Sequence, residues 1–242
     1  MRVHLRAQCP GGGRARDLDP PCKPLPPSHA CRACALWRWP LPCSGPALQR
    51  RKTLALLVYL AVTGKPHTRD FLAALFYPEL DQQRARAYLR RDLAVLNTSL
   101  ARGPDTNSAG WLAADRDLVE LRRSPSLWLD VDRFRHLAAA GRSHPHSPDT
   151  GCAACIPLLT EAADLYTGAF LAGFSLADSA EFDDWQFFQA ESLRLELGAL
   201  LQRLVAGLAE AGSCAAALPY ARRWVSLDPL HEIAQRHLIR LY

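Results

Sequence analysis

The side chains in this sequence that are best suited to bind a ligand gather in residues 81–100, DQQRARAYLRRDLAVLNTSL. Arg84, Tyr88 and Arg91 recur at spacings of four and three, which places them on one arc of a helix. A guanidinium group carries a planar fork of donors that fits a phosphate or the edge of a guanine. The pattern therefore favours a surface that binds a polyanion, and the alternative is an ordinary solvated helix face. The basic and aromatic side chains of this arc and its flanks are Arg84, Arg86, Tyr88, Arg90 and Arg91.

An apolar stripe in the same stretch predicts how this helix is held. Asp81 can cap the first turn, because its carboxylate can accept a backbone N–H that has no partner inside the helix. We therefore expect a helix over residues 81–100 that buries one face and exposes a cationic one. The apolar residues that recur at helical spacing are Ala85, Leu89, Leu93, Leu96 and Leu100.

A run of cations opens another expected helix, residues 50–63, RRKTLALLVYLAVT. The helix dipole disfavours positive charge in a first turn. These side chains therefore either hold an external anion such as phosphate or are simply solvated. The three cations are Arg50, Arg51 and Lys52, and the expected buried stripe is Leu54, Leu57, Val58, Ala61 and Val62.

A short helix and a hairpin complete this part of the chain. Thr68 can cap a helix over residues 69–76, which begins with Arg69. Two short strands, residues 111–113 and 118–121, are expected to form a hairpin with Arg116 at its tip. Three helices followed by a hairpin is the order of a winged helix-turn-helix, in which the last helix enters the major groove.

Residues 50–97 resemble the OmpR-type winged helix of bacterial regulators of the antibiotic-regulatory-protein class. In these regulators a bacterial transcriptional activator domain follows, built from tetratricopeptide-like helix pairs. The matching pieces are Arg51-Lys52, the LLVYLA run, Arg69, the LFYP corner at 75–78, Ala85-Arg86 and Leu89-Arg90. The second half is similar to the activator domain in three motifs, LWLDVDRFRHL, LYTGAFLAGF and FDDWQF. We expect long helices over residues 181–211, 214–227 and 230–242.

The expected helices of the second half supply apolar residues for a core. The aromatic residues Trp185, Phe187, Phe188 and Trp224 are interpreted as packing residues rather than as a ligand-stacking site. The leucines expected in the core are Leu193, Leu197, Leu200, Leu204 and Leu208.

The chain departs from the family at both ends. Residues 1–49 are rich in Pro, Gly, Arg and Cys and show no strand or helix period after MRVHL. We interpret them as a disordered or aberrant segment, out of frame or degenerate, in place of the family's usual β-sheet. The family domain continues beyond residue 242, so the activator domain, residues 124–242, is expected to be C-terminally truncated, with a marginally stable last helix.

Two imidazoles and two thiols lie within twelve residues of one expected loop. Together they form a complete tetrahedral ligand set for a structural zinc ion, and the alternative is a polar loop with reduced thiols. No other cofactor is expected. The candidate ligands are His144, His146, Cys152 and Cys155.

Composition narrows the class of protein. The longest apolar run, Leu54–Val62, is too short to cross a bilayer, and no secretory signal opens the chain. We therefore expect a cytoplasmic protein with reduced cysteines and no membrane partner. Residues 50–123 carry 13 Lys/Arg against 8 Asp/Glu, and residues 124–242 carry 9 against 14. A polyanion is therefore expected to meet the first of these segments.

The sequence thus predicts a mainly α protein: a winged helix-turn-helix with a short β-hairpin wing over residues 50–123, then an α-helical tetratricopeptide-like repeat domain. No nucleophile elbow, P-loop or dinucleotide motif is found, so an enzyme is not expected. The expected function is sequence-specific binding of double-stranded DNA to regulate transcription. RNA polymerase or a second copy is the family-implied partner of the repeat domain. The alternative is a helical-repeat interaction module whose DNA-binding half does not function.

Overall fold

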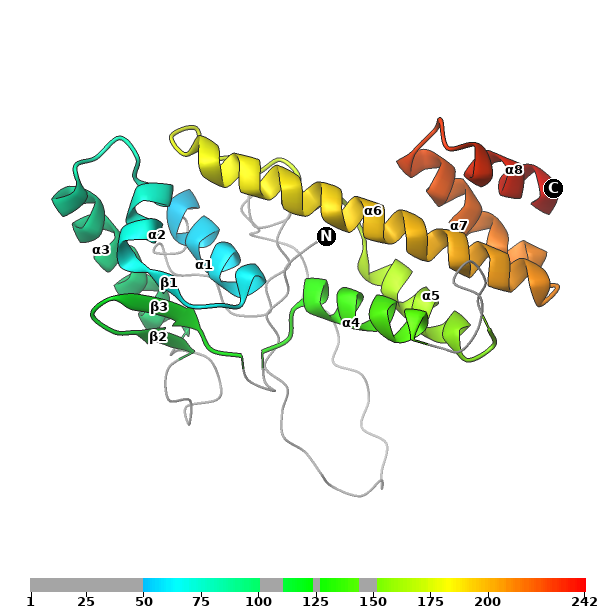
Figure 1. Ribbon diagram of the computed structural model, residues 1–242, viewed down its shortest axis with the longest axis horizontal. Helices are drawn as coiled ribbons and strands as arrows, with labels where there is room; N and C mark the ends of the chain where they lie inside the picture. The colour runs from blue at the N-terminus through cyan, green and yellow to red at the C-terminus, as the bar shows by residue number, and fades with distance from the viewer. Residues whose placement is uncertain (1–49, 101–110, 124–126, 144–151) are drawn as a thin grey trace, which may run out of the picture. The chain divides into compact units, whose positions relative to one another are not determined.

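The computed structural model describes residues 50–100, 111–123, 127–143 and 152–242 (Figure 1). These ranges hold eight helices and one three-stranded sheet of order β1-β3-β2, so the protein is mainly helical. The chain divides into two compact units, which are taken in turn below. The first contains residues 50–69 and 90–129 as far as they are described, and the second contains residues 70–89 and 130–242. Residues 1–49, for which an aberrant segment was predicted, lie outside the described residues.

The first unit is built around a small antiparallel sheet. The central strand β3 (Leu118–Leu121) pairs with β2 (Leu112–Ala114) and with β1 (His67–Thr68). The predicted hairpin is confirmed, although β2 begins one residue later than predicted. The sequence did not predict β1, because two residues are too few to show the alternation of a strand.

Helix α1 (Arg51–Thr63) supplies the apolar core of this unit and packs against β3. The predicted buried stripe is too narrow, because Leu56, Tyr59 and Leu60 are buried as well. Leu54 is only half-buried, which corrects its predicted place in the core. A helix that is apolar nearly all round is buried on more than one side. Gly64 ends α1 with φ 59°, a left-handed conformation that favours glycine.

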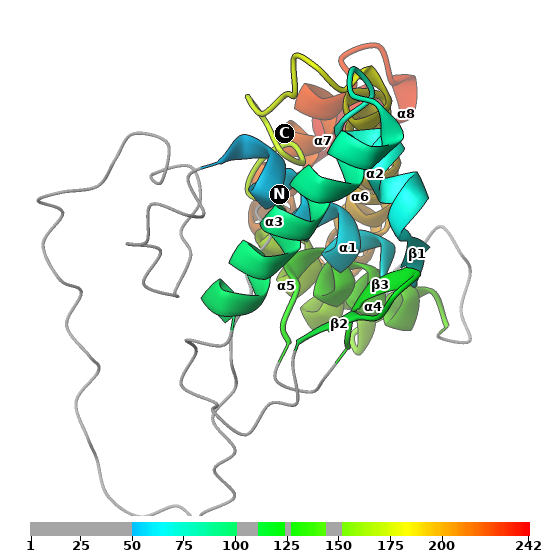
Figure 2. The ribbon, with the colours of Figure 1, turned by 90° about the vertical axis from the view of Figure 1, so that its left-hand side faces the viewer.

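The second unit contains α2 (Arg69–Phe76) from residue 70 on, the first half of α3 (Gln82–Leu100), and five later helices. Neighbouring helices in the chain pack in pairs, α4 with α5, α5 with α6, α6 with α7 and α7 with α8 (Figure 1, Figure 2). The later helices are α4 (Asp130–Arg142), α5 (Cys155–Leu165), α6 (Ala180–Glu210), α7 (Cys214–Leu227) and α8 (Glu232–Leu241).

Helix α2 contacts the start of α6 within this unit. The Ser179 hydroxyl donates a hydrogen bond to the Leu75 carbonyl over 2.6 Å, and both atoms are buried. The rings of Phe76 and Phe182 lie with their centroids 5.6 Å apart. These contacts satisfy a carbonyl at the C-terminal end of α2, where the helix itself offers no partner.

The predicted leucine core of α6 is confirmed, and all five of its leucines are at most 8% exposed. The packing interpretation is wrong for Phe187 and Phe188, which are 61% and 68% exposed. They lie on a face of α6 that no described element covers. Trp224 is buried as expected, whereas Trp185 is only half-buried.

A glycine allows close packing of three helices in this unit. A Cβ atom on Gly141 of α4 would lie 2.9 Å from Leu159 Cδ2 of α5 and 3.9 Å from Arg203 Nη1 of α6. Leu159 is fully buried, so it has little room to move aside. The side chain of residue 141 therefore limits how closely α4 and α5 approach.

We predict that Gly141→Ala lowers the free energy of unfolding by about 1–3 kcal/mol, because the added methyl overpacks the contact with Leu159. Gly198→Ala in α6 is the matched control, because a Cβ there meets no atom within 4 Å. Removing this helical glycine should leave stability unchanged or raise it by up to about 1 kcal/mol. Urea denaturation of both variants measures the difference, and equal effects of the two substitutions would contradict the packing account.

Candidate nucleic-acid interface

Helix α3 is stabilised by a cap at its first turn and by an apolar stripe that is buried along one face. Asp81 Oδ1 accepts a hydrogen bond from the Arg84 backbone N–H over 3.0 Å, which confirms the predicted cap. The stripe is buried along its whole length, with exposures of 8% or less. Its members are Ala85, Leu89, Leu93, Leu96 and Leu100.

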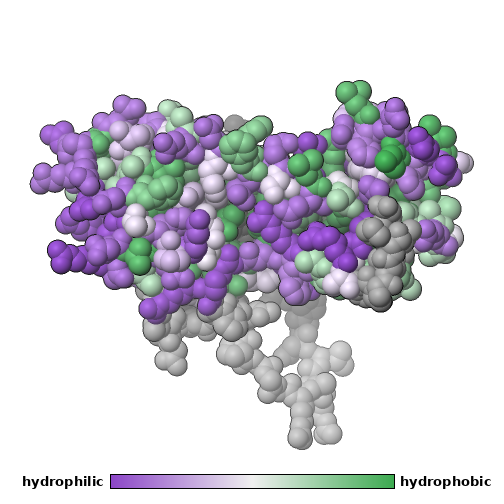
Figure 3. Space-filling view, viewed as in Figure 1, coloured by the Kyte–Doolittle hydropathy of each residue, from purple (hydrophilic) through white to green (hydrophobic). Residues whose placement is uncertain are grey.

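The opposite arc of α3 is exposed, as the sequence predicts. The side chains of Arg84 and Arg91 are 76% and 50% exposed, and Tyr88 is 42% exposed. Arg86 and Arg90 are exposed as well. Figure 3 shows hydrophilic side chains gathered over α3. A single helix therefore presents guanidinium groups and a tyrosine to solvent, the side chains suited to phosphates and base edges.

The arginines of this arc differ in what they already bind. Arg84 Nε lies 3.3 Å from an Asp81 carboxylate oxygen, and Arg91 Nε lies 3.9 Å from Asp92 Oδ1. The Arg84–Asp81 pair is exposed on both sides, so it is weak and screened by salt, and an incoming phosphate can compete with it. Asp92 is buried, so only the arginine of the second pair faces solvent. The ring of Tyr88 packs on the ring of Tyr77, with centroids 5.6 Å apart, which orients the phenol.

Arg86 is held by a second helix. Its guanidinium forms two hydrogen bonds with both oxygens of Asp70 on α2, and Gln82 donates to the same carboxylate over 3.3 Å. These donors, Arg86 first, lower the pKa of Asp70. Arg86 therefore links α2 to α3, and this places it as a positioning residue beside the exposed arc.

The cations at the start of α1 are accessible. Arg50 and Arg51 are exposed and Lys52 is half-buried. Arg50 is the N-cap residue, its own side chain makes no capping hydrogen bond, and the first turn contains no acidic residue. The backbone N–H groups and the cations of this turn therefore both favour an anion.

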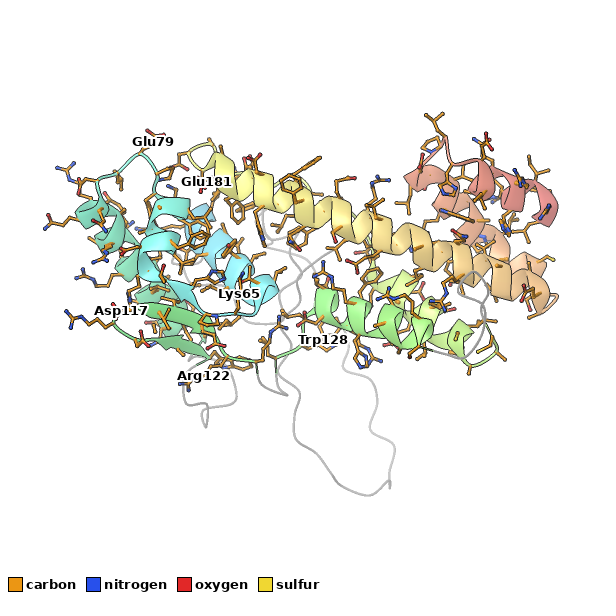
Figure 4. All side chains as sticks on the ribbon, viewed as in Figure 1. Lys65, Glu79, Asp117, Arg122, Trp128 and Glu181 are labelled. Carbon is orange, nitrogen blue, oxygen red and sulfur yellow. The ribbon has the colours of Figure 1, made fainter. Side chains whose placement is uncertain are left out.

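Arg69 supports the hairpin. Its Nε donates to the Asp115 carbonyl over 2.8 Å, and its backbone N–H donates to the Asp117 carbonyl over 2.9 Å. The Asp115 carboxylate in turn accepts the backbone N–H groups of Leu118 and Asp117, which lower its pKa. Figure 4 labels Asp117 in this turn between β2 and β3.

Arg116 lies in the same turn, and it is exposed as predicted. Sequence reasoning did not select Arg122 and Arg123, which follow β3. Arg123 Nη2 donates to the Ala61 carbonyl of α1 over 3.0 Å, and partial burial lowers its pKa. Arg123 also fills the space beside Gly64, where a Cβ would lie 2.5 Å from Nη2. Only the net positive charge of this segment could have drawn attention to these residues.

Half of the proposed zinc set is described. The Sγ atoms of Cys152 and Cys155 lie 3.3 Å apart at the start of α5, and neither forms a disulfide. The hydrogen bond between the two thiols lowers the pKa of Cys152, whereas burial raises the pKa of Cys155. His144 and His146 lie outside the described residues, so the zinc site stays a prediction. Within the described ranges, no group of three or more ligand side chains could hold a metal ion.

The described helices contain no membrane span, since none is both long and apolar enough to cross a bilayer.

A family model described as the bacterial transcriptional activator domain matches residues 129–242, just under half of the chain. The matched region begins one residue before α4 and includes all the helices from α4 to α8. It supports a bacterial transcriptional activator domain in this part of the chain. The family is a regulatory class associated with transcriptional activation and is not an enzyme class. No curated protein matches the chain.

We predict that Arg69→Ala lowers the free energy of unfolding by about 0.5–1.5 kcal/mol, because the Asp115 carbonyl loses its side-chain donor. Amide exchange in the hairpin turn, residues 115–118, should accelerate at the same time. Arg116→Ala removes the same charge from the turn itself without removing a described hydrogen bond, and it should change neither quantity. Hairpin exchange that is identical in the two variants would contradict the supporting role of Arg69.

Proposed function

We propose that this protein is a bacterial transcription regulator that binds double-stranded DNA in a sequence-specific manner through α3. The observation that carries the proposal is the division of α3 into a fully buried apolar stripe and an exposed arc of arginines with a tyrosine. The family match over residues 129–242 supports a role in transcription independently of that helix.

In this proposal the first half of the chain acts as an OmpR-type winged helix. Arg84, Tyr88 and Arg91 meet base edges in the major groove, with Arg90 beside them and Arg86 positioning the helix through Asp70. Phosphate contacts fix the register of a protein on DNA and base contacts specify the site. The phosphate contacts come from Arg50, Arg51, Lys52 and Arg69, and Arg116 serves the wing.

The second half acts as a tetratricopeptide-like domain that binds a protein partner, RNA polymerase or a second copy of the chain. Helices that pack on their neighbours in the chain, as α4 to α8 do, are the unit of such repeats. The exposed apolar side chains of α6 support a protein partner, because Phe187, Phe188 and Leu195 are 61–68% exposed. Apolar residues exposed together on one surface often mark an interaction site. A regulator of this kind acts in the cytoplasm.

The test is a salt-dependent binding titration of the full chain. Duplexes that the protein enriches from a random-sequence pool supply the probe, and the shuffled duplex is the control. We predict that Arg84→Ala/Arg91→Ala weakens the free energy of binding to the enriched duplex by about 1–3 kcal/mol for each matched base contact that is lost. Each such loss raises Kd about 5- to 150-fold. Arg50→Ala should instead weaken binding to all sequences and reduce the salt slope by about one.

The matched control is Arg236→Ala/Arg240→Ala, which removes two exposed arginines from α8 at helical spacing. It should leave binding unchanged if α3 is the reading helix. Weak binding that ignores sequence and is the same in both double variants would refute the regulator. It would favour the alternative function, a helical-repeat interaction module, for which the exposed side chains of α6 are the supporting observation.

A further inference from the structure

We propose that Cys152 and Cys155 form a reversible dithiol–disulfide pair, a modification site that exchanges with low-molecular-weight disulfides. The site lies at the start of α5, inside the region that matches the activator domain family, and it does not depend on DNA binding.

The two thiols are already within reach of each other. Their Sγ atoms lie 3.3 Å apart, and a disulfide needs about 2 Å. The backbone N–H of Cys155 donates to the Cys152 carbonyl over 2.9 Å, so a tight turn brings the two residues together before α5 begins. Closing the bond therefore asks for a small side-chain movement and no rearrangement of helices.

The two thiols differ in access to solvent. Cys152 is half-buried, whereas Cys155 is 0% exposed and its Sγ lies 3.6 Å from the Gly141 carbonyl of α4. A disulfide from solution can therefore reach Cys152 but not Cys155. This asymmetry assigns Cys152 as the attacking thiol and Cys155 as the thiol that resolves the mixed disulfide.

A buried cation lies next to the pair. Arg203 of α6 is 6% exposed, and its Nη2 donates to the same Gly141 carbonyl that Cys155 contacts. Its Nε has no hydrogen-bond partner in the described structure. A positive charge in a poorly solvated place favours negative charge on a neighbouring sulfur during exchange.

The exchange balances with one equivalent of a disulfide, RSSR. The Cys152 sulfur attacks one sulfur of RSSR, the reagent's S–S bond breaks, and one RSH leaves with the proton of the Cys152 thiol. The Cys155 sulfur then attacks Cys152 Sγ and displaces the second RSH, which takes the proton of the Cys155 thiol. The two protein sulfurs are oxidised and the two reagent sulfurs are reduced.

Oxidation would change a packed contact. Disulfide formation removes the Cys155 S–H, so this sulfur can no longer donate to the Gly141 carbonyl, which it contacts over 3.6 Å in the reduced state. That carbonyl and Arg203 lie where α4, α5 and α6 meet. Oxidation of the pair therefore changes a contact at the point where three helices of the activator-domain region pack together.

In the test, the reduced chain is equilibrated with mixtures of glutathione disulfide and glutathione. The remaining thiols are then alkylated with iodoacetamide after unfolding, and the tryptic peptides are mapped by mass. The chain offers a clean readout, because peptide 143–194 contains Cys152, Cys155 and no other cysteine. Peptide 204–222 contains the exposed Cys214 alone and serves as the internal control.

As glutathione disulfide increases, peptide 143–194 should lose the mass of two hydrogens and carry no alkyl group or glutathione. Peptide 204–222 should carry either an alkyl group or glutathione under the same conditions. Cys155→Ser should trap glutathione on Cys152, and Cys152→Ser should leave Cys155 a thiol that is alkylated only after unfolding.

Three results would overturn the proposal. The first is a wild-type peptide 143–194 that carries two alkyl groups at every ratio. The second is glutathione that remains on Cys152 in the wild type. The third is protection of both thiols that ends when a zinc chelator is added, which would assign the pair to a metal ion.

Discussion

Burial of the apolar stripe on α3 is the constraint on which the proposed function depends. Its leucines are at most 8% exposed. Each fully buried leucine contributes about 1.5–3 kcal/mol relative to an exposed one. Rotating α3 by one residue, about 100°, would expose leucines and bury arginines that have no buried partner. The stripe therefore fixes which side chains face solvent, and the cationic arc follows from it.

The basic residues of the first half divide into those that bond to another element and those with only local contacts among the described residues. Arg86 and Arg69 each bond to another element, a carboxylate on α2 and a carbonyl of the hairpin turn respectively. Arg84 and Arg116 have exposed side chains with only local contacts among those described. The same residue type thus serves both to position the elements and to present charge, and net charge alone does not separate the two roles.

Local pattern predicted most of the helices, because capping and periodicity are properties of neighbouring residues. Helices α2 and α7 have the predicted bounds, and α3 has the predicted cap and stripe. The features that the local pattern did not reveal come from contacts between distant residues. Strand β1 exists through pairing with β3, about fifty residues later. Arg86 bonds to a carboxylate sixteen residues earlier, on another helix.

Other features that the sequence did not show have the same origin. Phe187 and Phe188 look like core residues by type, but their exposure depends on which elements pack against α6. The spacing of Cys152 and Cys155 was visible in the sequence and suggested a metal site. The asymmetry between the two thiols was not visible, because it arises from α4 and from Arg203 of α6. The proposal of a dithiol–disulfide pair therefore rests on packing between distant residues as well as on the spacing of the two cysteines.

Photo-crosslinking is a direct way to find out whether the exposed arc of α3 contacts DNA, as we propose. A benzophenone-bearing phenylalanine would replace Tyr88 in one variant and Phe187, an exposed aromatic residue of α6, in another. Duplexes enriched by the wild-type protein would be irradiated with each variant. We predict a crosslink to the duplex from position 88 and none from position 187. No crosslink from position 88, or equal crosslinking from both positions, would contradict it.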